Sequence, residues 1–286
     1  MKKILVQLDT DPRPSVFDRV VAVDAGVDEL MSYGGITPEN VEPLVHGAMF
    51  TRGGEGLKNT AIFVGGSDVA AGEQLLARVV KTFFGPVRVS VLMDSNGSNT
   101  TAAAAVLLAR KHLPLKDVPV LVLAGTGPVG HRAAQLLASE GAAVRVGSRT
   151  TPKATQTCEA IRDVISGANV TPVATSEPDS LKSACDGVQL IIAAGAAGIE
   201  LLSAEDRKQI KSLKVAIDVN AVPPLGIGGL EVMDRAKERD GVICYGAIGV
   251  GGTKMKIHKA ALARLFESNT QVLDTDAIYR IGETLA

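Results

Sequence analysis

Apolar and polar positions follow two alternating patterns along the chain, and together these patterns predict an α/β protein. Short apolar runs such as KILVQL (3–8) and VLVLA (120–124) are typical of buried strands. Between such runs lie segments with apolar residues three and four positions apart, as in an amphipathic helix over 68–84 with Asp68 as its expected N-cap. Because strands and helices alternate, we predict parallel sheets.

The same patterns locate the individual elements. Strands are expected over residues 3–8, 60–66, 87–93, 120–124, 142–149, 170–175, 188–194, 214–220 and 241–247. Helices are expected over residues 15–26, 68–84, 100–113, 131–141, 152–166, 178–185, 203–211, 258–268 and 275–285.

A short polar link with two prolines, PLKDVP (114–119), divides the predicted elements into two groups. We therefore expect a first α/β domain over 1–115 and a second, more regular parallel-sheet domain over 116–257. The remaining segment, 258–286, is expected to form helices that pack back on the first domain.

The second domain opens with a glycine pattern that predicts a dinucleotide-binding site of the Rossmann type. VLAGTGPVG has the G-x-G-x-x-G spacing between a buried strand and an amphipathic helix. The first glycine permits a tight turn, the second a close approach to a pyrophosphate, and the third close packing of helix on strand. The predicted contacts are Gly125, Thr126, Gly127, Pro128, Val129 and Gly130.

The end of the next strand favours NADP over NAD. An NAD site normally places a carboxylate there for the ribose 2′-hydroxyl, but no acid lies between Gly141 and Thr157. Ser148, Arg149 and Lys153 instead offer a hydroxyl and two cations, which suit a 2′-phosphate. The alternative is a solvated arginine in a surface turn.

Later strand ends add further candidates. The strand at 188–194 runs into the small residues AGA (194–196), which let the nicotinamide half approach, and the strand at 214–220 ends in a polar pair. Lys254 and Lys256 alternate with apolar residues, which suits a strand or extended turn with both amines on one side, or simply a basic surface cluster. The predicted cofactor contacts are Ala194, Gly195, Ala196 and Asn220, while Asp218 is the other member of the polar pair.

In the first domain, two polar turns, QLDTDPRPS and LMDSNGSNTT, follow predicted strands. Because the carboxyl ends of parallel strands share one edge, these turns should face an active-site cleft against the second domain. Capping of the next helix by Ser98 or Asn99 is the alternative.

Composition and charge exclude several other classes. The net charge is −1 and Trp is absent, so neither a basic nucleic-acid footprint nor an aromatic stacking platform is expected. The three cysteines and four histidines show no metal-ligand spacing, so no metal site is predicted. No stretch approaches the roughly 20 apolar residues of a membrane span, and the N-terminus has the pattern of a strand rather than of a signal peptide. We expect a cytoplasmic protein without a membrane partner.

Several long stretches resemble one family. DSNGSNTTAAA, LAGTGPVG, AAGAAGIELL, PPLGIGG and GAIGVGGTKMKIHKA look like the NADP-dependent methylene-tetrahydromethanopterin dehydrogenases of one-carbon-metabolising bacteria, and the resemblance covers nearly the whole chain. It implies two α/β domains with the active site between them, a tetrahydropterin carrier as substrate, and a homo-oligomer, a trimer or a hexamer. The first domain would then bind the pterin and the second NADP.

The resemblance also implies the reaction, which is reversible hydride transfer between the methylene bridge of the carrier and NADP. Some members accept methylene-tetrahydrofolate, which is the alternative substrate; a non-enzymatic NADPH-sensing module is a further alternative. Related folate dehydrogenase/cyclohydrolases carry Tyr-x-x-x-Lys, whereas Tyr33, Tyr245 and Tyr279 here lack a lysine four residues on. We expect dehydrogenase activity without strong cyclohydrolase activity.

This chemistry needs few catalytic groups, because removal of hydride from an N–CH2–N bridge moves no proton. A carboxylate such as Asp94 or Asp9 would offset the growing positive charge, and the lysines would bind the pterin or its polar tail. The predicted catalytic residues are Asp94 and Lys256. The predicted substrate-binding residues are Asp9, Asp11, Ser15, Asn96, Gly97, Ser98, Asn99 and Lys254.

Overall fold

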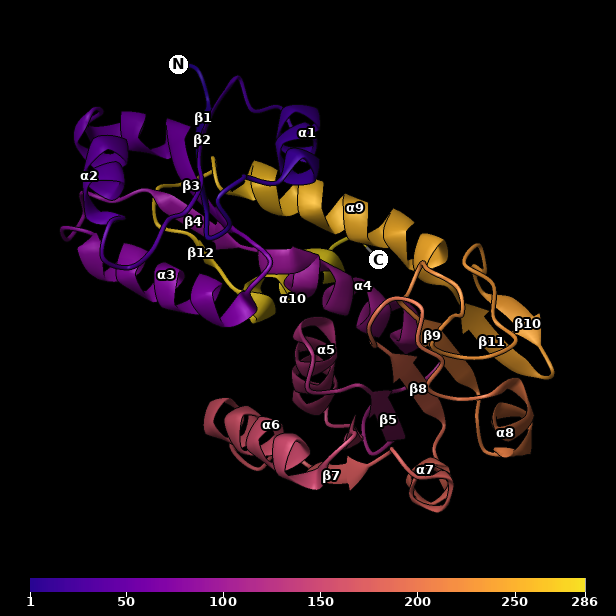
Figure 1. The fold of residues 1–286 in the computed structure, drawn as a ribbon. Helices are drawn as coiled ribbons and strands as arrows, with labels where there is room; N and C mark the ends of the chain where they lie inside the picture. The colour runs from indigo at the N-terminus through magenta and orange to yellow at the C-terminus, as the bar shows by residue number, and fades with distance from the viewer. Residues whose placement is uncertain (286) are drawn as a thin grey trace. The chain divides into compact units, whose positions relative to one another are not determined.

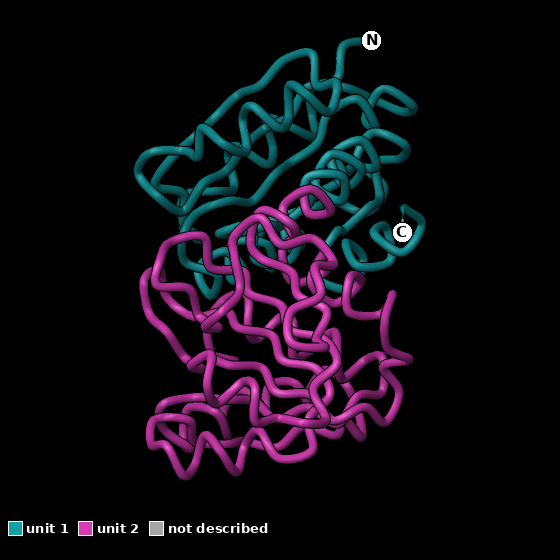
Figure 2. The backbone as a smooth tube through the Cα atoms, turned by 90° about the vertical axis from the view of Figure 1, so that its right-hand side faces the viewer, with its two compact units in different colours: residues 1–100, 255–285 teal, residues 101–254, 286 magenta. Residues whose placement is uncertain are grey.

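The computed structural model describes residues 1–285, which form two compact α/β units (Figure 1). Unit 1 contains residues 1–100 and 255–285, and unit 2 contains residues 101–254 (Figure 2). The chain passes from unit 1 to unit 2 within helix α4 (Ser98–Arg110) and returns within helix α9 (Ala247–Arg264). Both passages therefore lie inside continuous helices rather than at the proline-containing link over 114–119.

Unit 1 is built on a five-stranded sheet in the order β12-β4-β3-β1-β2, and every neighbouring pair is parallel. Its strands are β1 (Ile4–Asp9), β2 (Glu29–Tyr33), β3 (Thr60–Gly65), β4 (Ser90–Met93) and β12 (Val272–Leu273). Its other elements are α1 (Val16–Asp24), α2 (Glu42–Phe50), α3 (Val69–Thr82), α10 (Thr275–Glu283) and the 3₁₀ turns η1 (Gly54–Asn59) and η2 (Ser95–Gly97).

The core of unit 1 follows from the two-residue period of its strands. Val6 and Leu8 of β1 and Ile62 of β3 share one face of the sheet, where they pack with Val45 of α2 and Leu75 of α3. This burial of branched apolar side chains fixes the register, because a slip of one residue would turn the apolar set to the opposite face. The carboxyl edge of the sheet is thereby held in one arrangement.

Unit 2 contains a seven-stranded sheet in the order β10-β11-β9-β8-β5-β6-β7. All pairs are parallel except β10 with β11. The strands are β5 (Pro119–Leu123), β6 (Ala143–Ser148), β7 (Val170–Ala174), β8 (Leu190–Ala193), β9 (Val215–Asp218), β10 (Lys237–Arg239) and β11 (Val242–Tyr245). The helices are α5 (Pro128–Ser139), α6 (Thr151–Val164), α7 (Pro178–Cys185) and α8 (Ala204–Gln209).

Strand order indicates where a ligand is expected at each sheet. Counted along the chain without the antiparallel β10, the six parallel strands of unit 2 run 3-2-1-4-5-6, the Rossmann order, and the order reverses between β5 and β8. The strands of unit 1 run 2-1-3-4-5, and the reversal lies between β1 and β3. In open parallel sheets, ligands bind outside the carboxyl ends of the strands at such points. The α/β fold predicted from the sequence is confirmed.

The strands β2, β10 and β12 and the helix α2 were not predicted, because their sequence signals are weak. β2 is an edge strand with three exposed residues, and β12 has only two residues. The helix expected over 258–268 begins earlier, at Ala247, despite glycines that oppose helix formation. Packing explains this, because a Cβ at Gly249 would lie 1.9 Å from the Asp234 carbonyl oxygen.

Burial of the thiols leads to a first prediction. Cys158, Cys185 and Cys244 are all buried, and burial raises the pKa of Cys185 and of Cys244 to about 11. Since the thiolate is the reactive form, native protein at pH 8 should not react with an aromatic disulfide reagent within minutes, whereas unfolded protein should release three equivalents. Fast reaction of any thiol in the native protein would contradict this burial.

Candidate active site

The glycine-rich loop after β5 is shaped by close backbone packing. Gly125 donates its N–H to the Gly147 carbonyl oxygen at 2.7 Å, which joins the loop to the end of β6. A Cβ at Gly130 would lie 2.4 Å from the Ala124 carbonyl oxygen, so only glycine lets α5 approach the strand this closely. At Gly127 the nearest atoms are 3.4 Å and 3.7 Å away, which leaves its outer side open.

The first turn of α5 presents unpaired donors beside that open glycine. Pro128 has no N–H, and His131 donates to the Gly127 carbonyl oxygen at 2.8 Å. The N–H groups of Val129 and Gly130 have no backbone partner within residues 1–285. Thr126 is half-buried in the same loop. Free N–H groups and the positive end of a helix dipole favour an anion at this point.

Three polar side chains at and just after the end of β6 form no hydrogen bond or ion pair with other described residues. The Ser148 side chain is nearly buried, and its hydroxyl has no hydrogen-bond partner among the described residues. Arg149 and Lys153 are exposed, and neither forms an ion pair with another described residue. The main chain of Ser148 is fixed, because its carbonyl oxygen accepts the Thr175 N–H at 2.8 Å. A rigid strand end thus carries one hydroxyl and two available cations.

The ends of β8 and β9 lie beside β5 on the same edge. Ala194 donates its N–H to the Leu123 carbonyl oxygen at 3.1 Å, and Gly195 packs against Leu201. The Asn220 side chain is committed to its own loop, since its oxygen accepts the Val222 N–H at 3.0 Å and its amide lies 3.5 Å from the Ala196 carbonyl oxygen. Asn220 therefore shapes this edge through the backbone that it holds.

Asp218, the last residue of β9, anchors the loop that follows. It is completely buried, and its two carboxylate oxygens accept the N–H groups of Asn220 at 2.9 Å and Ile227 at 2.8 Å. Burial raises the pKa of Asp218, while the backbone hydrogen bonds act in the opposite direction. The carboxylate thus fixes both ends of the segment between Asn220 and Ile227.

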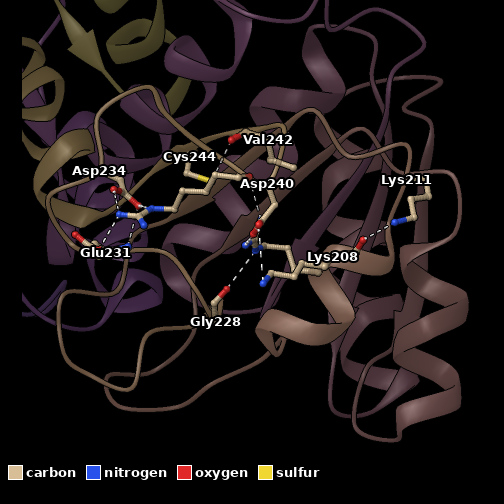
Figure 3. Close-up of polar contacts among 10 residues, drawn as sticks. Lys208, Lys211, Gly228, Glu231, Asp234, Asp240, Val242 and Cys244 are labelled. Carbon is tan, nitrogen blue, oxygen red and sulfur yellow. Dashed lines mark hydrogen bonds and ion pairs between the residues drawn. The ribbon is translucent and has the colours of Figure 1, made fainter.

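Two arginines also hold this loop, and Figure 3 labels their partners Gly228, Asp234 and Asp240. The buried guanidinium of Arg207 donates to the Gly228 carbonyl oxygen at 3.2 Å and to Asp240 at 2.6 Å. Arg239 makes a two-pronged contact with Asp234, with both bonds at 2.7 Å. Burial alone would raise the pKa of Asp234, but the bonds from Arg239 lower it below its usual value. The loop between β9 and β10 is therefore rigidly attached.

At the carboxyl edge of unit 1, Asp9 ends β1 and is buried. Its carboxylate accepts the N–H groups of Asp11 and Ser15, both at 3.0 Å, and burial raises the pKa of Asp9. Asp11 is half-buried and binds both the N–H and the hydroxyl of Ser67. Ser15 caps α1 by accepting the Asp18 N–H at 3.2 Å. These acids connect the loops on either side of the reversal between β1 and β3.

Asp94, which follows β4, has the same kind of role. It is fully buried, and its carboxylate accepts the N–H groups of Asn99 and Thr100 at 2.9 Å and 3.1 Å and the Thr100 hydroxyl at 2.6 Å. Ser98 and Asn99 are also buried and bond to main-chain oxygens. Neither Ser98 nor Asn99 therefore caps the helix as the alternative supposed, because both side chains donate to main-chain oxygens and it is Asp94 that accepts N–H groups of the first turn of α4.

Asn96 differs from its neighbours in the same turn. Its backbone adopts φ 55° and ψ 20°, and the following Gly97 has φ 60°. The Asn96 side chain is exposed and makes no hydrogen bond with another described residue, while its N–H donates to the Gly66 carbonyl oxygen at 2.7 Å. Asparagine tolerates this left-handed conformation better than most residues. Among the predicted residues of this turn, Asn96 is therefore the one whose side chain is free to bind a ligand.

The expected strand around Lys254 and Lys256 is wrong, because both residues lie within α9. Successive helical residues are rotated by about 100°, so residues two apart point to nearly opposite sides. The two amines cannot share one side, and Lys256 is exposed while Lys254 is half-buried. The preceding residues of α9, AIGVGGT (247–253), contain three glycines and no apolar period typical of a helix.

Residues 1–285 contain no group of three or more His, Cys, Asp or Glu side chains arranged to hold a metal ion. No helix in that part of the chain is long and apolar enough to cross a membrane.

Arg207 and Ser67 were not predicted as site residues. Arg207 lies in the charged run AEDRKQ, which has the composition of an exposed helix, and the sequence contains no signal for its burial. Ser67 follows two glycines in a loop, and its pairing with Asp11 depends on the parallel register of β1 with β3. Long-range pairing of this kind is not visible in a single sequence.

Comparison with solved structures identifies the fold. Shikimate 5-dehydrogenase from Listeria monocytogenes, solved with shikimate and NAD, is 13% identical, with 100% of this chain and 96% of that chain covered and a TM-score of 0.56. At this identity the likeness concerns the fold alone. Fold and strand-end geometry together define an α/β protein of two mainly parallel sheets with a Rossmann-type unit.

Comparison with known sequences then identifies the family. Residues 16–96 match the N-terminal region of methylene-tetrahydromethanopterin dehydrogenase. Bifunctional protein MdtA of Methylorubrum extorquens is 47% identical, covering 100% of this chain and 99% of that protein. The NAD(P)-dependent methylenetetrahydromethanopterin dehydrogenase of the same organism is 31% identical with the same coverage. The chain belongs to the methylene-tetrahydromethanopterin dehydrogenase family, a family of oxidoreductases, which confirms the resemblance seen in the sequence.

The anchoring role of Asp218 predicts a stability change. In Asp218→Asn one oxygen is replaced by an NH2 group that faces a backbone N–H, so a buried donor loses its acceptor. We expect the free energy of unfolding at pH 7 to fall by about 1–3 kcal/mol, measured by urea denaturation. The matched control is Asp163→Asn on the exposed side of α6, expected to change it by less than about 0.5 kcal/mol. Equal unfolding curves for the two variants would contradict the role of Asp218.

Proposed function

We propose that this protein is an NADP-dependent methylene-tetrahydromethanopterin dehydrogenase. Membership of the family supports the carrier as substrate. The choice of NADP as cofactor rests on Ser148, Arg149 and Lys153 near the end of β6. Their side chains have no hydrogen-bond or ion-pair partner among the described residues. A guanidinium and an amine without acidic partners suit a 2′-phosphate, and the carboxylate that would repel it is missing.

The remainder of the unit 2 edge fits a dinucleotide. The free N–H groups of Val129 and Gly130 and the open side of Gly127 suit the pyrophosphate. Beside them, the small residues Ala194, Gly195 and Ala196 leave room for the nicotinamide half. Unit 2 is accordingly the proposed NADP-binding part, and unit 1 the carrier-binding part.

When bound, NADP supplies the hydride acceptor. The residues of the chain are required to bind, orient and exclude water, because loss of hydride from a carbon between two nitrogens leaves no proton to remove. The oxygens of Asp9, Asp94 and Asp218 already accept N–H groups, which makes these carboxylates poor candidates for a general base. Rate enhancement then comes mainly from orientation, with reacting carbons about 3–3.5 Å apart.

For the carrier, the available groups of unit 1 are few. We propose that Asn96 and the backbone at Gly97 contact the polar edge of the pterin, while Asp11 and Ser15 set the loop beside them. Asp94 contributes by holding the turn that carries Asn96, rather than by touching the substrate. Lys256 on α9 remains a predicted catalytic residue, with its exposed amine available to polar groups of the carrier. The homo-oligomer implied by the resemblance remains a prediction.

The cofactor assignment predicts a selective effect of Arg149→Ala. Loss of one charge-assisted contact to the 2′-phosphate should lower kcat/KM for NADP by about tenfold or more, while kcat/KM for NAD stays within about twofold. Steady-state rates with each cofactor at a saturating carrier concentration measure this ratio.

Lys182→Ala is the matched control, since Lys182 is an exposed cation on α7 of the same unit. It should leave both values unchanged. An equal loss with NADP and NAD in Arg149→Ala would show that the arginine does not recognise the 2′-phosphate.

The carrier assignment is tested by a direct comparison. Purified protein and NADP are mixed with methylene-tetrahydromethanopterin or methylene-tetrahydrofolate, and the absorbance of the reduced nicotinamide is followed. We expect reduction with the methanopterin carrier, at a higher kcat/KM than with the folate carrier. Absence of reduction with both carriers would overturn the proposed enzyme.

A further inference from the structure

Two loops at the carboxyl edge of unit 2 are joined into one surface. One follows β8 (residues 194–202) and the other follows β9 (residues 219–229). The Gly198 N–H donates to the Val222 carbonyl oxygen at 3.2 Å, and the Leu201 N–H donates to the Gly226 carbonyl oxygen at 2.8 Å. Farther along, Gly228 donates to the Leu202 carbonyl oxygen at 2.8 Å. We call this pair of loops the double loop.

The double loop is attached to the rest of unit 2 by hydrogen bonds and by close backbone packing. Asp218 accepts the Ile227 N–H from below, and Arg207 donates to the Gly228 carbonyl oxygen. At Gly228 a Cβ would lie 2.5 Å from the Ala204 nitrogen, so the backbone packs directly on the start of α8. These contacts attach the second loop to β9 and to the start of α8.

Two apolar side chains of the double loop are exposed. Ile199 and Val222 are each 51% exposed, while Leu202 and Ile227 of the same double loop are buried. The bond between Gly198 and Val222 places the two exposed side chains on neighbouring segments. An isolated exposed apolar residue is ordinary, but a pair held together at a ligand-binding edge indicates an apolar contact surface.

Strand order decides which ligand group this surface meets. The glycine-rich loop after β5 would take the pyrophosphate, and the cations after β6 would take the 2′-phosphate on the adenosine side. β8 and β9 lie on the other side of β5, so a dinucleotide bound at this edge directs its nicotinamide ring toward their loops. The faces of the ring are flat and largely apolar, so they can pack against the apolar side chains of Ile199 and Val222.

We propose that Ile199 and Val222 form the contact surface for one face of the nicotinamide ring. The proposal rests on the proposed NADP-dependent function. By covering one face, the two side chains exclude water from it and leave the opposite face to react with the carrier. This assigns a positioning role to two residues that carry no functional group of their own.

The test is a binding measurement with the double variant Ile199→Ser/Val222→Ser. Two ligands are titrated, NADPH, which contains the ring, and adenosine 2′,5′-bisphosphate, which has the 2′-phosphate but no nicotinamide. The dissociation constant for NADPH should rise by about tenfold, and that for the bisphosphate should stay within about twofold. The fluorescence of bound NADPH should shift toward that of NADPH in water, because the ring becomes more hydrated.

The controls are Val164→Ser on α6 and Met233→Ser before β10, which remove apolar side chains of high exposure elsewhere in unit 2. Both should bind the two ligands as the unchanged protein does. Because Ile199 and Val222 are half-exposed, the double variant is expected to fold, and the single variants Ile199→Ala and Val222→Ala provide the same comparison with smaller changes.

Two outcomes overturn the proposal. One is unchanged NADPH affinity in the double variant, and a higher KM for the carrier in that case would assign the surface to the carrier. The other is an equal loss of affinity for NADPH and the bisphosphate, which would indicate a general change at the edge. Failure of the unchanged protein to bind the bisphosphate is a separate result, since it would contradict the proposed NADP site itself.

Discussion

Three buried aspartates at strand ends determine the loops on which the rest of the candidate site depends. Asp9 ends β1, Asp94 follows β4 and Asp218 ends β9. Each carboxylate accepts two backbone N–H groups, from the following loop at Asp9 and Asp218 and from the first turn of α4 at Asp94. Burial raises the pKa of Asp9 and of Asp218, because it removes the charged carboxylate from water. Hydrogen bonds to the charged form offset that penalty.

This arrangement divides the polar residues of both edges into two groups. The aspartates, Asn99 and Asn220 are occupied by contacts within the protein, and they define where the backbone lies. Ser148, Arg149, Lys153 and Asn96 are without side-chain partners among residues 1–285 and stand where ligands of each sheet are expected. A site of this kind binds and orients, and it offers no obvious carboxylate for proton transfer. That composition suits the removal of a hydride from a carbon flanked by two nitrogens.

Much of this could be predicted from the sequence where the signal is local. The glycine spacing at 125–130 and the missing acid after the next strand predict a dinucleotide edge, because each depends on residues close together in the chain. The polar turns at Asp9 and Asp94 were correctly placed at strand ends, but their burial could not be read from the sequence. A carboxylate that accepts N–H groups has the same sequence signature as one that contacts a substrate.

Features that depend on distant contacts were missed for the same reason. Arg207 is buried because α8 packs against Gly228 and Asp240, which lie more than 20 residues away. Lys254 and Lys256 fall in a helix because Gly246 and Gly249 allow it to pack on the backbone of residues 231–234. The alternation of these lysines with apolar residues argued for an extended segment, whereas tertiary packing determined the outcome.

The central claim is that the buried carboxylates are structural and that the carrier loses a hydride directly, without loss of a proton to a base. Carrier with two deuterium atoms on the methylene bridge tests this in one measurement, by mass analysis of the reduced nicotinamide and of the solvent. The account predicts one deuterium in each reduced nicotinamide formed and none released to water. Deuterium in the solvent would contradict it, because a protein base would then have removed the atom as a proton.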